Sequence, residues 1–271
     1  MKLSRSLGRS ALVSVAAVSA IVLGFVAPAA AETVDVSGVG HGTVLPSFGG
    51  SGTPLLDQFE YRYSNSDHHL KTVASRPGAG FIEIAFADSN GDDEYSFRHI
   101  YQRVSFGVST GSMHNQCGGG ACTRTISRPP GDVVFVITGF KFDFGGDHHI
   151  DSIGIVESNG QLTTWFDDQN NDDDYTVDVD FAWVPRSRLG TLGEVRPPAP
   201  VHASGTSTVS TVSGNKIIRG FRVNKAASGQ DDHIKSFGIR TNSTSINVLY
   251  GDQNPADSPD WTYRVQFAVL L

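Results

Sequence analysis

The residues of this 271-residue chain that could do chemistry fall into two short patterns, and each pattern occurs three times. The first pattern is an aspartate, a variable residue and a histidine, followed by Leu or Ile. Its copies are Asp67 with His69, Asp147 with His149, and Asp231 with His233. Because residues two apart on an extended chain point to the same side, each carboxylate can hydrogen-bond its imidazole and fix the tautomer. Three roles fit such a pair: a structural anchor, part of a ligand-binding site, or an acid–base pair in catalysis.

The second pattern begins 21 residues after each of those first aspartates and reads Asp-x-Asn, with further acids behind it. The side chains that could share an ion are Asp88, Asn90 and Asp92; Asp168, Asn170 and Asp172; and Asp252, Asn254 and Asp257. Calcium takes about six to eight oxygen ligands, and alternate residues of a tight loop can supply them. The sequence therefore predicts a calcium site in each loop, weaker in the third copy, where Ala256 replaces the acid at the fifth position. The alternative is that Asp and Asn only form Asx turns and keep hairpin tips solvated.

One aromatic residue, Trp165, lies just before the second acidic loop. A flat apolar ring beside acids and amides is suited to stacking on a sugar whose hydroxyls bond the polar groups. Trp165 is therefore a candidate ligand-binding residue, together with the three Asp/His pairs. The alternative is that Trp165 belongs to the core, where large aromatic side chains are ordinarily buried.

Three copies of the same two patterns indicate duplication of a unit of about 80 residues. Between the patterns, runs of β-branched and aromatic residues are separated by Gly, Pro, Asn and Asp clusters, as expected for short strands and turns. Polar and apolar residues alternate over 175–183, which predicts a strand with one dry face. We predict an all-β fold of three tandem antiparallel units, each a small sandwich or an open barrel.

The expected units are residues 32–108, 109–188 and 189–271, and the Pro-rich stretch 185–200 is the expected linker before the third unit. Two arrangements of these units fit the sequence equally well. They can be separate domains on a string, or they can pack as one closed body with pseudo-threefold symmetry.

Residues 1–31 have the form of a secretory signal peptide. Lys2, Arg5 and Arg9 precede an apolar run over 11–26, and small residues lead to a cleavage site after Ala31. We therefore predict a secreted, extracellular protein. In that oxidising setting, two nearby cysteines are expected to form a disulfide that pins a short loop. The pair is Cys117 and Cys122.

Charge and composition exclude several classes of protein. A formal net charge of -7 is unfavourable for binding phosphates, so no nucleic-acid partner is expected. No apolar run after the signal reaches the roughly 20 residues of a membrane-spanning helix. Charged residues at 18% and hydrophobic residues at 39% are typical of a folded chain and not of a disordered one.

Residues 125–184 resemble H-type lectin domains. The resemblance rests on a long strand led by Pro129 and Pro130, a strand that ends near Trp165, and a last strand that closes on Phe181-Ala182-Trp183-Val184. It covers one unit of three, and neither the Asp/His pairs nor the Asp-x-Asn loops are part of it, so it assigns no binding residue. What the resemblance implies is a glycan-binding sandwich.

These observations predict a secreted, non-catalytic, multivalent binding protein for glycans or a cell-surface ligand, with calcium in its acidic loops. Repeated units favour binding over catalysis because several equivalent sites raise avidity for a repetitive ligand. One alternative is a secreted metal-dependent or carboxylate-based hydrolase in which Asp168 and His149 act as acid and base. The other is a structural or interaction protein with solvated acidic loops.

Overall fold

The protein is described by a computed structural model over residues 31–39, 42–64, 71–87, 94–144, 150–168, 174–197, 201–202, 205–225, 234–252 and 260–271. The strands are β1 (Ala31–Val39), β2 (Gly42–Val44), β3 (Thr53–Ser64), β4 (Thr72–Pro77), β5 (Ile82–Ala87), β6 (Glu94–Val104), β7 (Ser109–Cys117), β8 (Gly120–Thr125), β9 (Val133–Phe144), β10 (Ile150–Ser158), β11 (Gln161–Asp168), β12 (Tyr175–Pro185), β13 (Leu189–Val195), β14 (Val201–His202), β15 (Gly205–Ser210), β16 (Lys216–Lys225), β17 (Ile234–Thr241), β18 (Ser245–Asp252) and β19 (Asp260–Leu270). Within these ranges the one helical element is a 3-10 turn, η1 (Arg186–Arg188).

These strands form three antiparallel sheets, which confirms the predicted all-β fold. Sheet 1 has the order β1-β6-β3-β17-β18-β15, and sheet 2 has the order β2-β5-β4-β9-β12-β7. Sheet 3 has the order β13-β19-β16-β10-β11-β8, with β14 beside β19. The alternation read from residues 175–183 is present in β12, where Tyr175, Val177 and Val179 are buried and the residues between them are half-buried.

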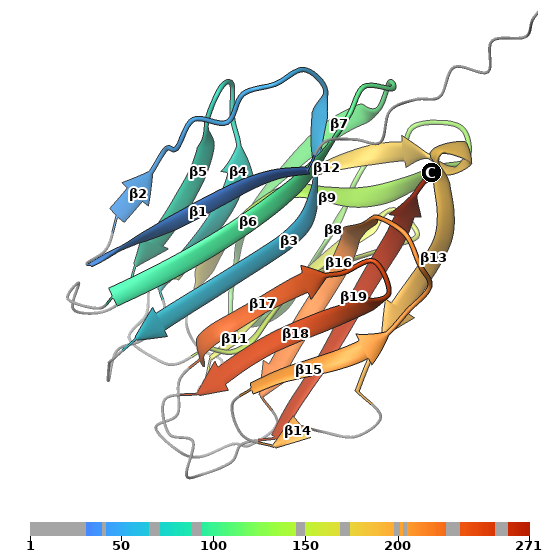
Figure 1. The fold of residues 1–271 in the computed structure, drawn as a ribbon. Coiled ribbons are helices and arrows are strands. Elements are labelled where there is room, and N and C mark those ends of the chain that lie inside the picture. Colours follow the sequence, from blue (N-terminus) through green and yellow to red (C-terminus); the bar gives the residue numbers. More distant parts are fainter. Residues whose placement is uncertain are drawn as a thin grey trace, which may run out of the picture.

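Each sheet combines strands from two of the three sequence segments. In sheet 1, β3 of the first segment pairs with β17 of the third, and Tyr61 lies opposite Phe237. In sheet 2, β4 of the first segment pairs with β9 of the second. In sheet 3, β10 of the second segment pairs with β16 of the third. Figure 1 shows β1, β6 and β3 side by side and continuing into β17, β18 and β15. The segments are thus joined in a ring by backbone hydrogen bonds. They form one closed body and not separate domains.

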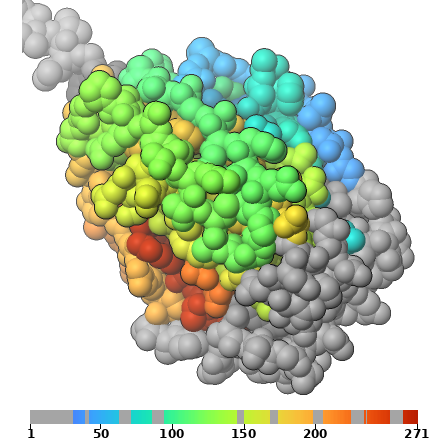
Figure 2. Space-filling view, turned by 180° about the vertical axis from the view of Figure 1, so that it is seen from behind, coloured from blue at the N-terminus to red at the C-terminus, as the bar shows by residue number. Residues whose placement is uncertain are grey.

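Within each segment, the two halves of its strands pack face to face as a small sandwich. In the first segment, Ser75 of β4 and Tyr101 of β6 share a hydrogen bond of 2.5 Å. In the third, Ser207 of β15 and Tyr263 of β19 share one of 2.6 Å. Viewed from behind, residues of the middle segment, drawn in green to yellow, lie between those of the first segment and those of the third (Figure 2). The fold is therefore three sandwiches whose sheets run on into one another.

Three phenylalanines on the central strands mark the pseudo-threefold axis. Phe59, Phe140 and Phe221 are spaced 81 residues apart and come from β3, β9 and β16. Their ring centroids are separated by 5.1, 4.8 and 5.6 Å, and all three are fully buried. Aromatic rings at these distances pack favourably, so one triangle of side chains ties the three sandwiches into a single core.

Glycines in strand interiors allow the close strand approach where one sandwich meets the next. A Cβ on Gly238 of β17 would lie 2.7 Å from the carbonyl oxygen of Phe59 and 2.8 Å from the Cα of Glu60. Gly154 of β10 is in the same position toward β16, with 2.7 Å to the carbonyl oxygen of Phe221. Side chains larger than hydrogen do not fit at such distances, which explains glycine inside otherwise β-rich runs.

The structure contains strands that hydrophobic patterning did not predict. β7 is rich in Ser, Gly, Asn and Gln, and its buried face consists of Met113, Asn115 and Cys117. β13 falls within the stretch expected to be a linker, and it pairs with β19 through Leu189 and Val195. Both are edge strands, and an edge strand is held mainly by backbone pairing to one neighbour, so its sequence carries a weak apolar signal.

In the part of the chain that the structure describes, no helix is long and apolar enough to cross a membrane. The expected signal peptide lies almost entirely outside the described residues, so secretion stays a prediction.

Candidate functional site

The middle segment shows how the fold positions the two sequence patterns. β9 ends at Phe144 opposite Tyr175, the first residue of β12. β10 begins at Ile150 opposite Asp168, the last residue of β11. The chain therefore passes from sheet 2 to sheet 3 between Phe144 and Ile150, and it returns from sheet 3 to sheet 2 between Asp168 and Tyr175. Residues 145–149 and 169–173 themselves lie outside the described part of the chain.

The same strand register recurs in the other two segments. In the first segment, Ser64 lies opposite Glu94, and Thr72 lies opposite Ala87. In the third, Lys225 lies opposite Trp261 and Ile234 lies opposite Asp252. Because each of these strands is antiparallel to its neighbours, all the strand ends that carry the six patterned stretches lie at one end of the molecule, the lower left in Figure 1. We call it the loop-bearing end.

Most side chains of the predicted calcium and ligand sites belong to residues outside the described ranges. These are Asp67, His69, Asp88, Asn90, Asp92, Asp147, His149, Asn170, Asp172, Asp231, His233, Asn254 and Asp257. Asp168 and Asp252 are described as the last backbone positions of β11 and β18. Among the described residues, no group of three or more His, Cys, Asp or Glu side chains is arranged to hold a metal ion. The calcium sites therefore stay predictions.

Further acidic residues lie on the strands beside the loop-bearing end. Asp143 is the next-to-last residue of β9, and its carboxylate accepts a hydrogen bond of 3.0 Å from the hydroxyl of Thr72 on β4. Asp167 is the next-to-last residue of β11, and burial raises the pKa of its carboxyl, opposed by the positive charge of Arg222. Asp174 is exposed immediately before β12. Three acidic residues of the described chain thus lie close to this end.

Trp165 lies half-buried on the outer face of sheet 3, outside the core clusters. Its Cα partners on the two neighbouring strands are small, Gly154 on β10 and Ala121 on β8. The guanidinium carbon of Arg222 lies 4.7 Å from the indole centroid. A cation at this distance is attracted to the ring quadrupole.

Arg222 joins Trp165 to the neighbouring polar groups. Its Nε donates to the Ser152 hydroxyl at 3.3 Å, and its guanidinium lies 3.9 Å from a carboxylate oxygen of Asp167. Trp165 and Asp168 are three residues apart on β11, so this outer-face cluster lies roughly 10 Å from the loop-bearing end.

Arg222 was not predicted as part of this cluster. It directly follows Phe221 as Lys141 directly follows Phe140, with the same 81-residue spacing, which aligns β16 with β9. That alignment does not encode the pairing of β16 with β10, and it is this pairing that sets Arg222 beside Trp165.

Two buried titratable groups lie away from the loop-bearing end. Asp57, at a β-bulge in β3, is 5% exposed and accepts hydrogen bonds from Gln102 Nε2 at 2.7 Å and from the hydroxyl of Thr241. Burial raises the pKa of Asp57 to about 6, although these hydrogen bonds and the Lys216 charge lower it. Burial also lowers the pKa of His99 to about 3. Within the described residues, neither ring nitrogen of His99 has a hydrogen-bond partner.

The structure confirms the predicted disulfide between Cys117 and Cys122. Cys117 ends β7, the edge strand of sheet 2, and Cys122 lies in β8, the edge strand of sheet 3. The bond therefore ties the edges of two sheets together, in addition to closing the short Gly-rich loop. Its role is wider than the loop constraint expected from the spacing of the two cysteines.

No protein-family model matches the chain, and no curated protein is significantly similar to it.

Proposed function

We propose that this protein is a secreted, non-catalytic, multivalent binding protein that uses its loop-bearing end to bind calcium and to recognise a glycan or another cell-surface ligand. The observation that supports this most is the repeated strand register. In two copies, Ile150 opposite Asp168 and Ile234 opposite Asp252, the first described residue after an Asp/His pair faces the first residue of the acidic stretch on the next strand of the chain.

Calcium is the ion that suits these stretches. Like charges crowded at one end of a molecule repel one another, and each close pair costs on the order of a kcal/mol near a surface. A hard cation with oxygen ligands removes that cost, and carboxylates with amides are the ligands that calcium takes. Histidine is not an expected calcium ligand, so the Asp/His pairs would act by supporting the acidic stretches or by contacting the bound ligand.

A glycan suits the neighbouring surface. Trp165 offers an aromatic ring on the flank of sheet 3, close to Asp168, and the half-buried guanidinium of Arg222 adds hydrogen-bond donors beside it. Sugars are recognised by such a combination of an apolar face with polar groups around it. Three copies of the acidic stretches at one end would let a branched or repetitive glycan be bound at more than one point, which raises avidity.

The first test of the proposal is calcium binding. Titration calorimetry of the metal-free protein with calcium should give heat, and the melting temperature should rise with calcium and fall back on addition of a chelator, because an ion that binds only the folded state stabilises it. The triple variant Asp88→Asn/Asp168→Asn/Asp252→Asn should lose both effects. Asp132→Asn is the matched control, since Asp132 is exposed and belongs to no patterned stretch. Absence of heat in the unaltered protein would remove calcium from the proposal.

The second test is binding to an array of glycans, with calcium present and with calcium removed. The protein should retain at least one class of glycan without cleaving it, and Trp165→Ala should weaken that binding while changing stability little, because Trp165 is only half-buried. Release of reducing sugar that depends on Asp168 alone would instead favour the hydrolase. No binding to any glycan would leave the solvated-scaffold alternative.

A further inference from the structure

A second surface feature lies on the outer face of sheet 1, in the first segment. It is a pocket of about 430 Å³, lined by Asp35, Val36, Ser37, Glu60, Ser96, Phe97 and Arg98. Its volume falls in the range of about 300–1,000 Å³ that is usual for small-ligand pockets. The lining comes from three adjacent strands, β1, β6 and β3, so regular backbone pairing fixes its shape. We call it the sheet 1 pocket.

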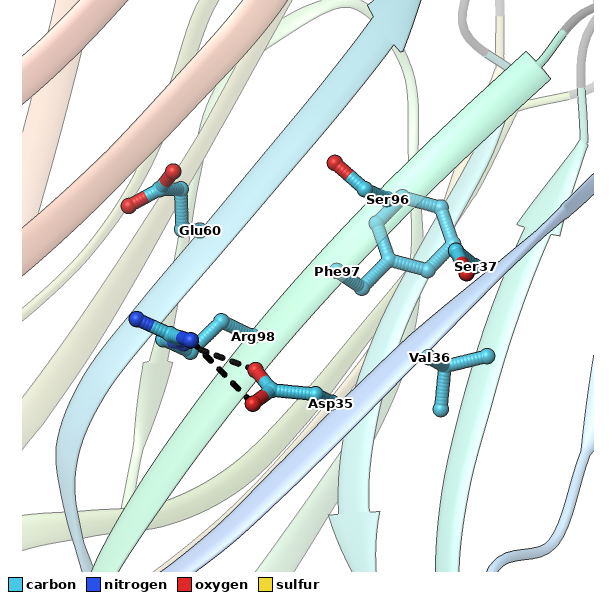
Figure 3. Close-up of a pocket in the computed structure, with 7 residues that line it drawn as sticks. All are labelled: Asp35, Val36, Ser37, Glu60, Ser96, Phe97 and Arg98. Atoms are coloured by element: carbon cyan, nitrogen blue, oxygen red, sulfur yellow. Dashed lines mark hydrogen bonds and ion pairs between the residues drawn. The ribbon is translucent and has the colours of Figure 1, made fainter.

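The polar groups of this pocket are held in place by ion pairs. Arg98 donates from Nε and from a terminal nitrogen to the two oxygens of Asp35, at 2.7 and 3.2 Å. Figure 3 shows this two-point contact, with Glu60 on the far side of Arg98. Glu60 in turn accepts hydrogen bonds from Arg240 at 2.6 Å and from Arg62. Bidentate guanidinium–carboxylate contacts restrict both side chains, so the pocket is preorganised.

The charge balance of this group argues against an ionic ligand. Asp35 and Glu60 supply two negative charges, and the three guanidinium groups that bind them supply three positive charges. No unpaired carboxylate remains among these five residues to attract a cation. Each arginine already faces a carboxylate, so an anion would compete with an existing ion pair at every position.

The hydrogen-bonding capacity of the same group is only partly used. An ionised carboxylate can accept about four hydrogen bonds and a guanidinium can donate about five. Within the described residues, Asp35 accepts two bonds from Arg98 and Arg98 donates two, so both keep open positions. The hydroxyls of Ser37 and Ser96 are exposed on paired positions of β1 and β6. A neutral ligand rich in hydroxyls can donate to the carboxylate and accept from the guanidinium without breaking their contact.

We propose that the sheet 1 pocket binds a neutral sugar residue through Asp35, Arg98 and Ser96. This inference rests on the proposed glycan-binding function and adds a second contact point to it. Ser96 is two residues from the start of β6 at the loop-bearing end, a distance of roughly 7 Å along the strand. A glycan bound at that end can therefore extend down the flank of sheet 1 into the pocket.

The pseudo-symmetry of the fold provides a matched control for this pocket. Tyr95 and Trp261 open β6 and β19 in the same way, so Arg264 is the counterpart of Arg98. Arg264 also pairs with an acid, Glu194, at 2.7 Å, and is similarly exposed. Its Cα partner on β16 is Arg222 in place of Glu60, so the same backbone position carries different chemistry on sheet 3.

The test is a nuclear magnetic resonance titration of the full mature chain with the methyl glycosides of glucose, galactose and mannose. Sialic acid serves as the anionic probe and lysine methyl ester as the cationic probe. At least one neutral glycoside should shift the amide signals of Ser37, Ser96 and Arg98. Arg98→Met and Asp35→Asn should each weaken that binding by about tenfold or more, as expected when a charged hydrogen-bond partner is removed. Arg264→Met should leave it unchanged. Melting temperatures of all three variants check that they fold.

Three results would overturn the proposal: no shift at these residues with any neutral glycoside, a preference for either charged probe, or equal weakening by Arg264→Met. The titration is run with and without calcium, which separates this proposal from the proposed function. If the glycan array is positive and the pocket signals do not move, the pocket assignment alone is wrong. The pocket amide signals could instead shift with a glycoside while calorimetry shows no calcium binding and the array retains no glycan. In that case the role of the loop-bearing end is wrong and the pocket assignment stands.

Discussion

At the scale of single residues, two buried ionisable groups should control how stability depends on pH, and they act in opposite directions. The pKa of Asp57 is raised by burial and that of His99 is lowered by burial. Both lie in sheet 1, on β3 and β6, and both shifts arise because the interior disfavours the charged form. Where their titration windows overlap, between about pH 4 and 6, their contributions to the free energy of unfolding largely cancel.

Replacing Asp57 should expose the His99 contribution. The pKa of Asp57 is about 6 in the folded protein and its ordinary value is 3.8, so the folded protein binds a proton that the unfolded chain releases between these values. Acidification through this window therefore stabilises the unaltered protein, by up to about 3 kcal/mol. In Asp57→Asn this gain is absent, and the free energy of unfolding should fall more steeply below pH 6. Urea unfolding at a series of pH values measures the difference, and an unchanged pH profile would contradict the assignment.

Replacing His99 should have the opposite effect. The unfolded chain protonates this imidazole near pH 6.5, and the folded protein resists protonation down to about pH 3. Stability contributed by neutral His99 is thus present above pH 6.5 and is lost as the pH falls toward 3. His99→Phe keeps a ring in the core and removes the titration, so the variant should resist acid better than the unaltered protein. The same urea series provides the measurement, with Asp57→Asn as the internal comparison.

At the scale of elements, the junctions between sandwiches depend on close strand approach. Gly238 and Gly154 occupy corresponding places in β17 and β10, and each lies against the backbone of a strand from another segment. The corresponding residue of β4 is Ala74, which is fully buried opposite Lys141. The three junctions therefore share their strand order and differ in how closely their strands approach.

Gly238→Ala should destabilise the protein by about 1–3 kcal/mol, since the added methyl group would overlap the backbone of Phe59 and Glu60. Denaturant unfolding measures this change. Gly107→Ala is the matched control, because a Cβ at Gly107 meets no atom within 4 Å, and it should change stability little. Equal effects of the two substitutions would show that the junction tolerates a wider spacing.

At the scale of the whole molecule, shared sheets make the three segments interdependent. β9 pairs with β4 of the first segment, and β10 pairs with β16 of the third, so the middle segment alone would expose two long strand edges and one side of the Phe59–Phe140–Phe221 triangle. Exposed edges and a divided core are both unfavourable.

The full chain should therefore unfold in one cooperative transition, seen at the same denaturant concentration by fluorescence and by circular dichroism. A protein consisting of residues 109–188 alone should show no such transition. A cooperative transition in the isolated segment, or three separate transitions in the full chain, would mean that each sandwich is stable without its neighbours.

The sequence by itself determined the β class, the threefold repetition, the disulfide and most strand positions. Each of these follows from local chemistry, since alternation along strands such as β12 and recurrence of the Asp-x-Asn and Asp/His patterns are visible without any long-range contact. Edge strands such as β7 and β13 were missed because backbone pairing holds them, and backbone pairing leaves little trace in side-chain type.

Only the tertiary structure decided how the repeats combine. The pairing of β3 with β17, in addition to its pairing with β6 of its own segment, depends on hydrogen bonds between residues about 180 positions apart, which no local pattern encodes. Pairing of β16 with β10 likewise sets Arg222 beside Trp165, and pairing of β1, β6 and β3 within the first segment gathers Asp35, Arg98 and Glu60 around one pocket. Backbone hydrogen bonds decide which strands lie side by side. The polar groups that share a surface across neighbouring strands are therefore fixed only by the strand order of the folded chain.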